Sequence, residues 1–312
     1  MQLAVYVPLL LPVLLAVLAR PISDRLHPQL ATWLLTAAAV VLAACATLAL
    51  GVLAASAAMR IPLVASLGHI SMSMLGPGTA YQTAAGALAV VALGAGAVTA
   101  TIFLIHRCRG LADAYSEARQ LSGLAQPVVL DDKTASAYTL PGRPGRIVVT
   151  AGMLDALDDA GRAALLAHER AHLAGFHHLY TSAARLAAAV NPLLRPAAQA
   201  VEYTVERWAD EEAAQAVGER RLVAHAIGRA ALAATPRQSR GRPAVLGAVF
   251  STVHRKPHAG PIPRRVAALL APAPPRRLAL LAVVLSVTFL AGACALIAAN
   301  DLQDLLALAS GY

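Results

Sequence analysis

Charged residues are scarce in this chain. Asp, Glu, Lys and Arg make up 14% of the 312 residues, against about 25% in typical soluble proteins. Hydrophobic residues reach 58%, and the mean hydropathy is +0.60. This composition excludes an ordinary soluble globular protein and indicates an integral-membrane protein.

Cysteine and aromatic residues are also few, and each shortage excludes a class of protein. The three cysteines, Cys45, Cys108 and Cys294, are not an even-numbered set, and two of them fall inside predicted membrane spans. No disulfide framework is therefore expected. Aromatic residues make up 4% of the chain, and none interleaves the basic run at residues 237–242. Binding of single-stranded nucleic acid uses such aromatic side chains for stacking, so no direct nucleic-acid partner is expected.

Four long uncharged runs are each long enough to cross a membrane, for which about 20 apolar residues are needed. The first run is the shortest, but no basic residue precedes it and no small-x-small site follows it, which argues against a cleaved signal peptide. In the third run, Gly86, Gly94 and Gly96 either allow close helix approach or are simply tolerated there. The predicted spans are residues 3–19, 29–57, 83–105 and 278–299.

Basic residues decide the predicted orientation, because Lys and Arg in short connections stay on the cytoplasmic side. All of the 26 Lys and Arg residues except Arg20, Arg25 and Arg60 lie within residues 106–277. We therefore expect a multi-pass protein of the cell (plasma) membrane with that segment in the cytoplasm and both termini outside. The net charge of +9 favours contact with an anionic lipid surface, at about 1 kcal/mol per nearby base. We expect residues 300–312 to form a short external tail, too small for a sensor domain.

An H-E-x-x-H motif lies in the run Leu-Leu-Ala-His-Glu-Arg-Ala-His-Leu at residues 165–173. Residues i and i+4 of a helix share one face, so the imidazoles of His168 and His172 can converge on one ion. Glu169 is placed to reach a water on that ion without becoming a ligand itself. Imidazole nitrogen and an open fourth position suit a catalytic Zn²⁺. The alternative is a chance match of five residues in a helix-rich chain.

Local signals predict a helix around this motif. Asp158 or Asp159 supplies an N-cap, and Gly175 ends the apolar periodicity. His177 and His178 follow this break, so their direction is not constrained. We interpret them as satisfied or exposed histidines rather than as further metal ligands.

The third metal ligand is predicted on a later helix. Glu202, Glu206 and Asp210 are spaced at i, i+4 and i+8, so they share one stripe of that helix. Two histidines and one carboxylate complete a His₂Glu zinc site. Glu206 is the favoured ligand and Glu202 the alternative, while Asp210 is expected to accept a hydrogen bond from a ligand imidazole N–H.

These two motifs carry a family resemblance. His168-Glu169-x-x-His172, followed 34 residues later by Glu206-x-x-Ala209-Asp210, resembles the integral-membrane zinc metallopeptidases. These include the BlaR/MecR antirepressor group and the related HtpX and CAAX-prenyl-protease group. Residues 145–154 also resemble that family, in which an edge strand turns into the metal helix. The resemblance covers about residues 110–270.

The same resemblance implies a histidine that stabilises the oxyanion during catalysis. His258 precedes Arg264-Arg265 at a similar place, although the spacing differs by about one residue and the His-Pro pair of the family is missing. His258 is therefore the candidate, and His254 competes with it. Arg265 is either a structural or subsite residue or a solvated charge near the membrane.

Within residues 106–277, the pattern predicts an amphipathic helix over 111–124 and short strands at 127–130, 137–140 and 147–150. The last strand is expected at an edge, where it either pairs with an extended substrate or is covered by another element. Residues 183–201 are interrupted by Asn191-Pro192 and are too short to span a membrane; core packing is the favoured role.

The fold expected from these observations is mainly α and integral to the membrane. Residues 1–105 hold three transmembrane helices. A cytoplasmic α+β, gluzincin-like zinc peptidase domain at residues 106–277 is inserted before the fourth, at 278–299.

The expected activity is that of a zinc metalloendopeptidase acting on a protein or peptide, with Glu169 as the general base. The architecture most resembles the BlaR/MecR group, which implies cleavage of a cytoplasmic or membrane-proximal regulator such as a BlaI-type transcriptional repressor. One alternative is an HtpX-like quality-control protease of membrane proteins. The other is a non-catalytic membrane signal transducer with a structural metal, against which the intact Glu169 argues.

Overall fold

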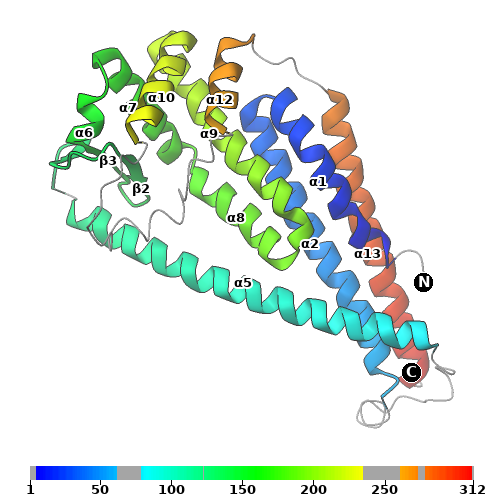
Figure 1. The fold of residues 1–312 in the computed structure, drawn as a ribbon. Helices are drawn as coiled ribbons and strands as arrows, with labels where there is room; N and C mark the ends of the chain where they lie inside the picture. The colour runs from blue at the N-terminus through cyan, green and yellow to red at the C-terminus, as the bar shows by residue number, and fades with distance from the viewer. Residues whose placement is uncertain (1–4, 62–78, 122, 235–260, 273–277, 311–312) are drawn as a thin grey trace.

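The computed structural model describes residues 5–61, 79–121, 123–234, 261–272 and 278–310. The chain is mainly helical, as expected, and one small sheet lies at one end of the molecule (Figure 1). The membrane helices meet at the opposite end.

Among the described residues, four helices are long and apolar enough to cross a membrane, and they correspond to the four predicted spans. The third continues beyond its apolar part, so the amphipathic helix expected from residue 111 is an extension of the span and ends at Gln120. No loop separates the span from the extension, so one continuous helix connects the membrane part to the sheet. These helices are α1 (Val7–Arg25), α2 (Pro28–Ala58), α5 (Ala80–Gln120) and α13 (Leu278–Ser310).

Helix α2 is at the centre of the membrane part and packs against α1, α5 and α13. Helix α5 touches α2 near its own N-terminus, where a Cβ at Gly86 would collide with Ala57. It then diverges from α2 (Figure 1), and helix α8 (His177–Val190) fills the space between them. At Gly96 a Cβ would lie 2.9 Å from the carbonyl oxygen of Val190 in α8, whereas Gly94 has no neighbour within 4 Å. Two of the three glycines thus permit close helix packing.

The sheet has three strands in the order β1-β3-β2. Strand β1 (Val128–Leu130) is parallel to β3 (Arg146–Thr150), and β2 (Ala137–Leu140) is antiparallel to it. The expectation that residues 147–150 form an edge strand is therefore wrong. The run Ile147-Val148-Val149 is buried on both faces, because Val148 packs towards α5 while Ile147 and Val149 pack towards Met153.

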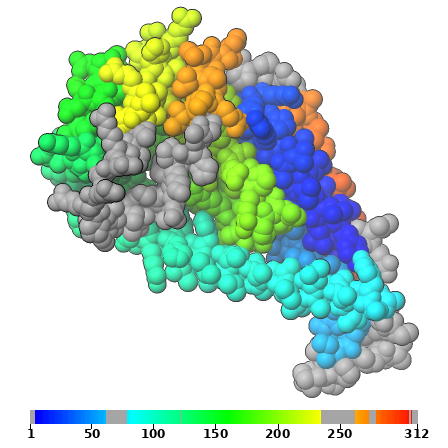
Figure 2. All heavy atoms as spheres, viewed as in Figure 1, coloured from blue at the N-terminus to red at the C-terminus, as the bar shows by residue number. Residues whose placement is uncertain are grey.

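The remaining helices lie beside the sheet or between it and the membrane helices (Figure 1). Helix α7 begins as predicted, because Asp158 is its N-cap and accepts a hydrogen bond from the Gly161 N–H. It ends at Gly175, and Phe176 then adopts the left-handed region at φ 49° before α8 begins. The helices are α6 (Ala151–Asp155), α7 (Asp159–Ala174), α8 (His177–Val190), η1 (Pro192–Leu194), α9 (Arg195–Val217), α10 (Arg220–Ala234) and α12 (Pro261–Leu270). Figure 2 shows α10 and α12 side by side on the surface.

Helices α8 and α9 pack directly on the membrane helices. In the described residues, one buried apolar cluster contains side chains of α1, α2, α8, α9 and α13. A polar contact also connects α9 to α1: the buried Arg207 of α9 donates to the carbonyl oxygen of Ser23 at 2.7 Å. Residues 183–201 therefore contribute to the core, as favoured from the sequence.

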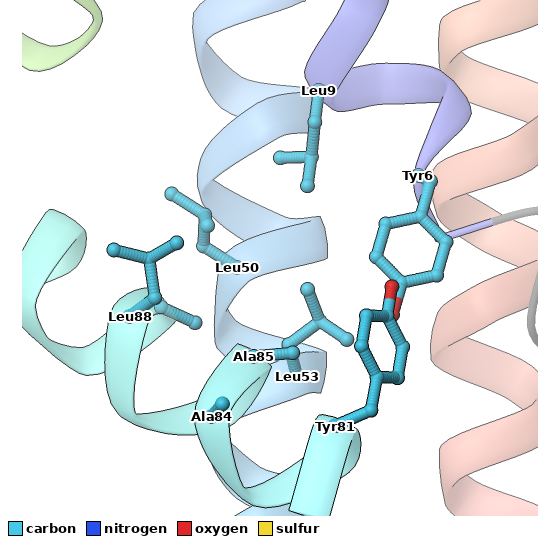
Figure 3. A pocket seen from close by; sticks show the side chains of 9 residues that line it. Tyr6, Leu9, Leu50, Leu53, Tyr81, Ala84, Ala85 and Leu88 are labelled. Carbon is cyan, nitrogen blue, oxygen red and sulfur yellow. The ribbon is translucent and has the colours of Figure 1, made fainter.

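An apolar cavity of about 400 Å³ lies between α1, α2 and α5 (Figure 3). The side chains of Tyr6 and Tyr81 form a hydrogen bond beside it. No lining residue comes from α7 or α9, so this cavity is separate from the H-E-x-x-H motif. It is lined by Tyr6, Leu9, Leu50, Leu53, Tyr81, Ala84, Ala85, Leu88 and Ala89.

Candidate metal centre

The two histidines of the H-E-x-x-H motif lie on one face of α7 and turn towards each other. Their Nε2 atoms are 3.1 Å apart, and the ring centroids are separated by 4.7 Å in an edge-to-face arrangement. Both side chains are largely buried, with 13% of His168 and 12% of His172 exposed. The i, i+4 spacing in the sequence therefore produces the convergence that was expected from it.

Helix α9 packs against α7 and brings a carboxylate to these nitrogen atoms. The Glu206 oxygens are 3.7 Å from Nε2 of His168 and 3.7 Å from Nε2 of His172. The alternative ligand Glu202 points elsewhere and pairs with Arg185 of α8 at 2.6 Å. Glu202 and Glu206 are about one helical turn apart, and only Glu206 faces the two histidines.

The donor set fits a zinc ion. One ligand atom from each of His168, His172 and Glu206 lies within 4.8 Å of the others. Two nitrogen atoms on a tetrahedral zinc, with bonds of about 2.05 Å, are about 3.3 Å apart, close to the observed 3.1 Å. Imidazole and carboxylate are also ligands that zinc accepts. The cluster is therefore compatible with a metal site.

Asp210 lies one turn beyond Glu206 and faces the other nitrogen of His168. Its Oδ1 is 3.0 Å from His168 Nδ1, within hydrogen-bonding distance, and its side chain is 2% exposed. An acceptor at Nδ1 keeps that nitrogen protonated and leaves Nε2 free for a metal. The distance is the one expected for Asp210 from the sequence, but the contact does not meet the angle of a hydrogen bond. The acceptor role of Asp210 therefore stays a prediction.

Arg265 of α12 connects the two carboxylates. Its Nε and Nη2 atoms donate to both oxygens of Asp210 at 2.8 and 2.6 Å, and Nη1 is 2.9 Å from Glu206 Oε2. The planar guanidinium suits this bidentate contact. Of the two interpretations weighed for Arg265, the solvated charge is wrong, since only 12% of its side chain is exposed.

These contacts shift the pKa values of the buried groups. Burial lowers the pKa of His168, but contacts with Asp210 and Glu206 outweigh it and raise the pKa to about 10. Burial would raise the pKa of both Glu206 and Asp210, yet Arg265 holds both below their usual range. The charged form of both carboxylates is therefore favoured, and a metal would compete with a proton for His168.

Glu169 lies on α7 beside the first ligand, and its side chain is buried, with the residue 8% exposed. Its charge helps to raise the pKa of Arg265, after the larger effects of burial, Asp210 and Glu206. The Glu169 carboxylate therefore acts electrostatically on the arginine that pairs with Glu206. A base next to the ligands is the arrangement that an H-E-x-x-H site needs.

His177 was not expected at the site, but it touches it. Its Nδ1 is 2.9 Å from Nδ1 of His172, and the residue is 2% exposed. Burial lowers the pKa of His177 to about 4, although Glu206 acts in the opposite direction. The sequence signal was only its place after Gly175, which does not fix the direction of the next helix. His178, in contrast, offers its backbone carbonyl to Arg107 of α5.

His254 and His258 lie outside the described residues. The oxyanion role that the resemblance implies for His258 therefore stays a prediction.

Residues 107–194 match the sequence profile of peptidase family M48. The M48 match begins in the extension of α5 beyond its apolar part and covers the sheet, α7 and α8. It thus includes His168, Glu169 and His172, and it ends before Glu206 on α9. Together with four candidate membrane helices, the M48 match supports a metallopeptidase of the membrane type. No curated protein and no solved structure matches the chain.

Proposed function

We propose that the protein is a membrane-embedded zinc endopeptidase. The observation that carries this proposal is the meeting of His168, His172 and Glu206 within 4.8 Å. It occurs on helices α7 and α9, and α7 lies inside the M48 match. The nearby Glu169 gives the cluster a base, which a purely structural metal site does not need. This favours an enzyme over the non-catalytic signal transducer.

Each residue of the site has its own proposed role in peptide hydrolysis. His168, His172 and Glu206 hold the metal, and a bound zinc ion supplies a Lewis acid that polarises the scissile carbonyl and lowers the pKa of water towards about 7. Glu169 accepts the proton of the attacking water on its carboxylate and delivers it to the leaving amine nitrogen. Asp210 and Arg265 keep His168 and Glu206 in place. His258 is the candidate for a hydrogen bond to the oxyanion.

The substrate is proposed to be a protein segment close to the membrane surface. Glu206 lies two residues from Thr204 and Trp208, which contact Thr32 and Trp33 of α2. Thr32 is four residues from the start of α2 at Pro28, about 6 Å along a helix. The ligands are therefore near the end of a membrane helix, the end that the basic residues assign to the cytoplasm.

Regulated proteolysis is the favoured biological role, with a cytoplasmic or membrane-proximal regulator as substrate. A BlaI-type repressor is one form of such a regulator, and it rests on the resemblance to the BlaR/MecR group. The alternative is an HtpX-like quality-control protease, and the position beside the membrane helices suits that role too. The number and type of substrates distinguish the two.

Substrate trapping with Glu169→Gln tests the role. This variant keeps the ligands and loses the base, so bound substrate is expected to co-purify with it. His168→Ala, which loses a ligand, is the control for non-specific capture. One regulator enriched on Glu169→Gln alone supports regulated proteolysis, whereas many unrelated membrane proteins support quality control. Equal capture by both variants contradicts a peptidase with this base.

A further inference from the structure

The second ligand of the proposed zinc site has its own hydrogen-bond partner, which is not a carboxylate. His172 presents Nε2 to His168 and Glu206, at 3.1 and 3.7 Å. Its other nitrogen, Nδ1, is 2.9 Å from Nδ1 of His177. The two rings meet edge to face, with centroids 4.8 Å apart and an interplanar angle of 88°. His177 thus lies beside Nδ1 of His172, just as Asp210 lies beside Nδ1 of His168.

Proton positions follow from this geometry. A neutral imidazole that binds a metal through Nε2 carries its proton on Nδ1. The Nδ1–H of His172 therefore points at Nδ1 of His177, and that atom has to accept. His177 must then carry its own proton on Nε2, because two N–H groups cannot share one short contact. Only one tautomer of His177 is compatible with a metal on His172.

The surroundings hold His177 in this position. It packs against Trp208 of α9, with ring centroids 4.5 Å apart, and Trp208 packs in turn against Trp33 of α2. On the opposite side, a Cβ at position 175 would collide with His177 Nε2, so Gly175 leaves the space that the ring occupies. His177 Nε2 has no hydrogen-bond partner among the described residues. Packing, and not a second hydrogen bond, therefore fixes the ring.

We infer that His177 is a positioning residue for zinc: it accepts the His172 Nδ1–H and so directs His172 Nε2 at the metal. This inference rests on the proposed function. It also assigns unlike partners to the two histidine ligands, a charged carboxylate for His168 and a neutral imidazole for His172. Partners of this kind typically change metal affinity 10- to 100-fold when they are removed.

Zinc affinity, measured by competition with a chelator on the purified full-length protein, tests the inference. His177→Phe keeps a ring against Trp208 but removes both nitrogen atoms, and zinc affinity is expected to fall about 10- to 100-fold. His177→Asn puts an amide oxygen near the former Nδ1 and is expected to recover most of that loss. His178→Phe alters the neighbouring, partly buried histidine, whose ring contacts Phe176, and is expected to bind zinc like the unmodified protein.

A second readout separates positioning from packing. Visible absorption of the cobalt-substituted protein reports ligand geometry, and it is expected to change in His177→Phe and to return towards normal in His177→Asn. Unchanged zinc affinity in His177→Phe would overturn the inference, as would equally weak binding by folded Phe and Asn variants. If His177→Phe does not fold, His177→Leu provides the same comparison with Asn.

If the proposed function itself were wrong, the zinc measurements would give a different result. In that case the unmodified protein binds no zinc, or His168→Ala binds it as tightly as the unmodified protein does. The effect of His177 is therefore assessed after these two measurements.

Discussion

The hydroxyl groups of Thr32 and Thr204 lie 2.9 Å apart and are fully buried, although 172 positions separate the two residues in the chain. The contact joins α2, a candidate membrane helix, to α9, which carries Glu206 and Asp210. Together with Trp33 against Trp208, it fixes the ligand helix directly to a membrane helix.

A double-mutant cycle on this pair measures the connection. Thr32→Val and Thr204→Val each remove one hydroxyl, while the double variant removes both and leaves neither unpaired. We expect a coupling energy of about 0.5–1.5 kcal/mol in thermal unfolding of the detergent-solubilised protein. Thr32→Val with Thr139→Val, on the distant strand β2, is the control and should be additive. Additive effects for Thr32 and Thr204 would contradict the contact.

Arg265 is expected to matter far more for stability than its neighbour Arg264. Arg265→Leu leaves the buried Asp210 and Glu206 without their cation, which typically costs about 3–5 kcal/mol. Arg264 pairs with Asp24 at 2.6 Å, but both side chains are about 40% exposed, so Arg264→Leu should cost about 1 kcal/mol or less. Thermal unfolding of both variants provides the comparison.

The stability of Arg265→Leu is also expected to depend on whether zinc is bound. A bound divalent cation compensates part of the charge of Glu206, so Arg265→Leu should be less destabilised with zinc than with a chelator. Equal unfolding temperatures for Arg264→Leu and Arg265→Leu would show that the contacts of Arg265 are not needed.

Tyr138 makes the structure sensitive to high pH. Its hydroxyl donates to Glu117 of α5 at 3.1 Å, and burial together with the charge of Glu117 raises its pKa to about 12. The folded state favours the neutral phenol, so this contribution to stability is full below about pH 10 and is lost as the pH rises towards 12. Tyr138→Phe should be less stable at neutral pH but lose less on going from pH 10 to 12. Identical pH profiles for the two proteins would refute the assignment.

The proposed topology is testable by cysteine labelling of intact cells, in a background without the native cysteines. Asp159 has a 99% exposed side chain at the start of α7, and Thr79 is exposed before α5. We expect Asp159→Cys to react with a membrane-impermeant reagent only after permeabilisation, and Thr79→Cys to react at once. The reverse pattern would place the metal cluster outside the cell.

Local sequence patterns predicted much of the fold and the core of the candidate site. Four apolar runs predicted the four candidate membrane helices, and Asp158 and Gly175 predicted the ends of α7, because these signals act within a few residues. The i, i+4 spacing predicted the convergence of His168 and His172 for the same reason.

Features that depend on distant contacts were not predictable. Whether β3 is central depends on β1 pairing with it from the far side, which no local pattern reports. The direction of His177 depends on the left-handed turn at Phe176 and on Trp208 from another helix. The choice of Glu206 over Glu202 depends on how α9 packs against α7.

The central claim is a catalytic zinc held next to the base Glu169, and the most direct test measures metal and cleavage on the same samples. The unmodified protein, Glu169→Gln and His168→Ala are purified, analysed for zinc by elemental analysis, and assayed with a denatured protein carrying self-quenching fluorophores. We expect about one zinc per chain in the first two, and cleavage by Glu169→Gln reduced by about 10²-fold or more. His168→Ala should lose both zinc and activity. Cleavage by Glu169→Gln at the unmodified rate, or an unmodified protein that cleaves without zinc, would contradict the account.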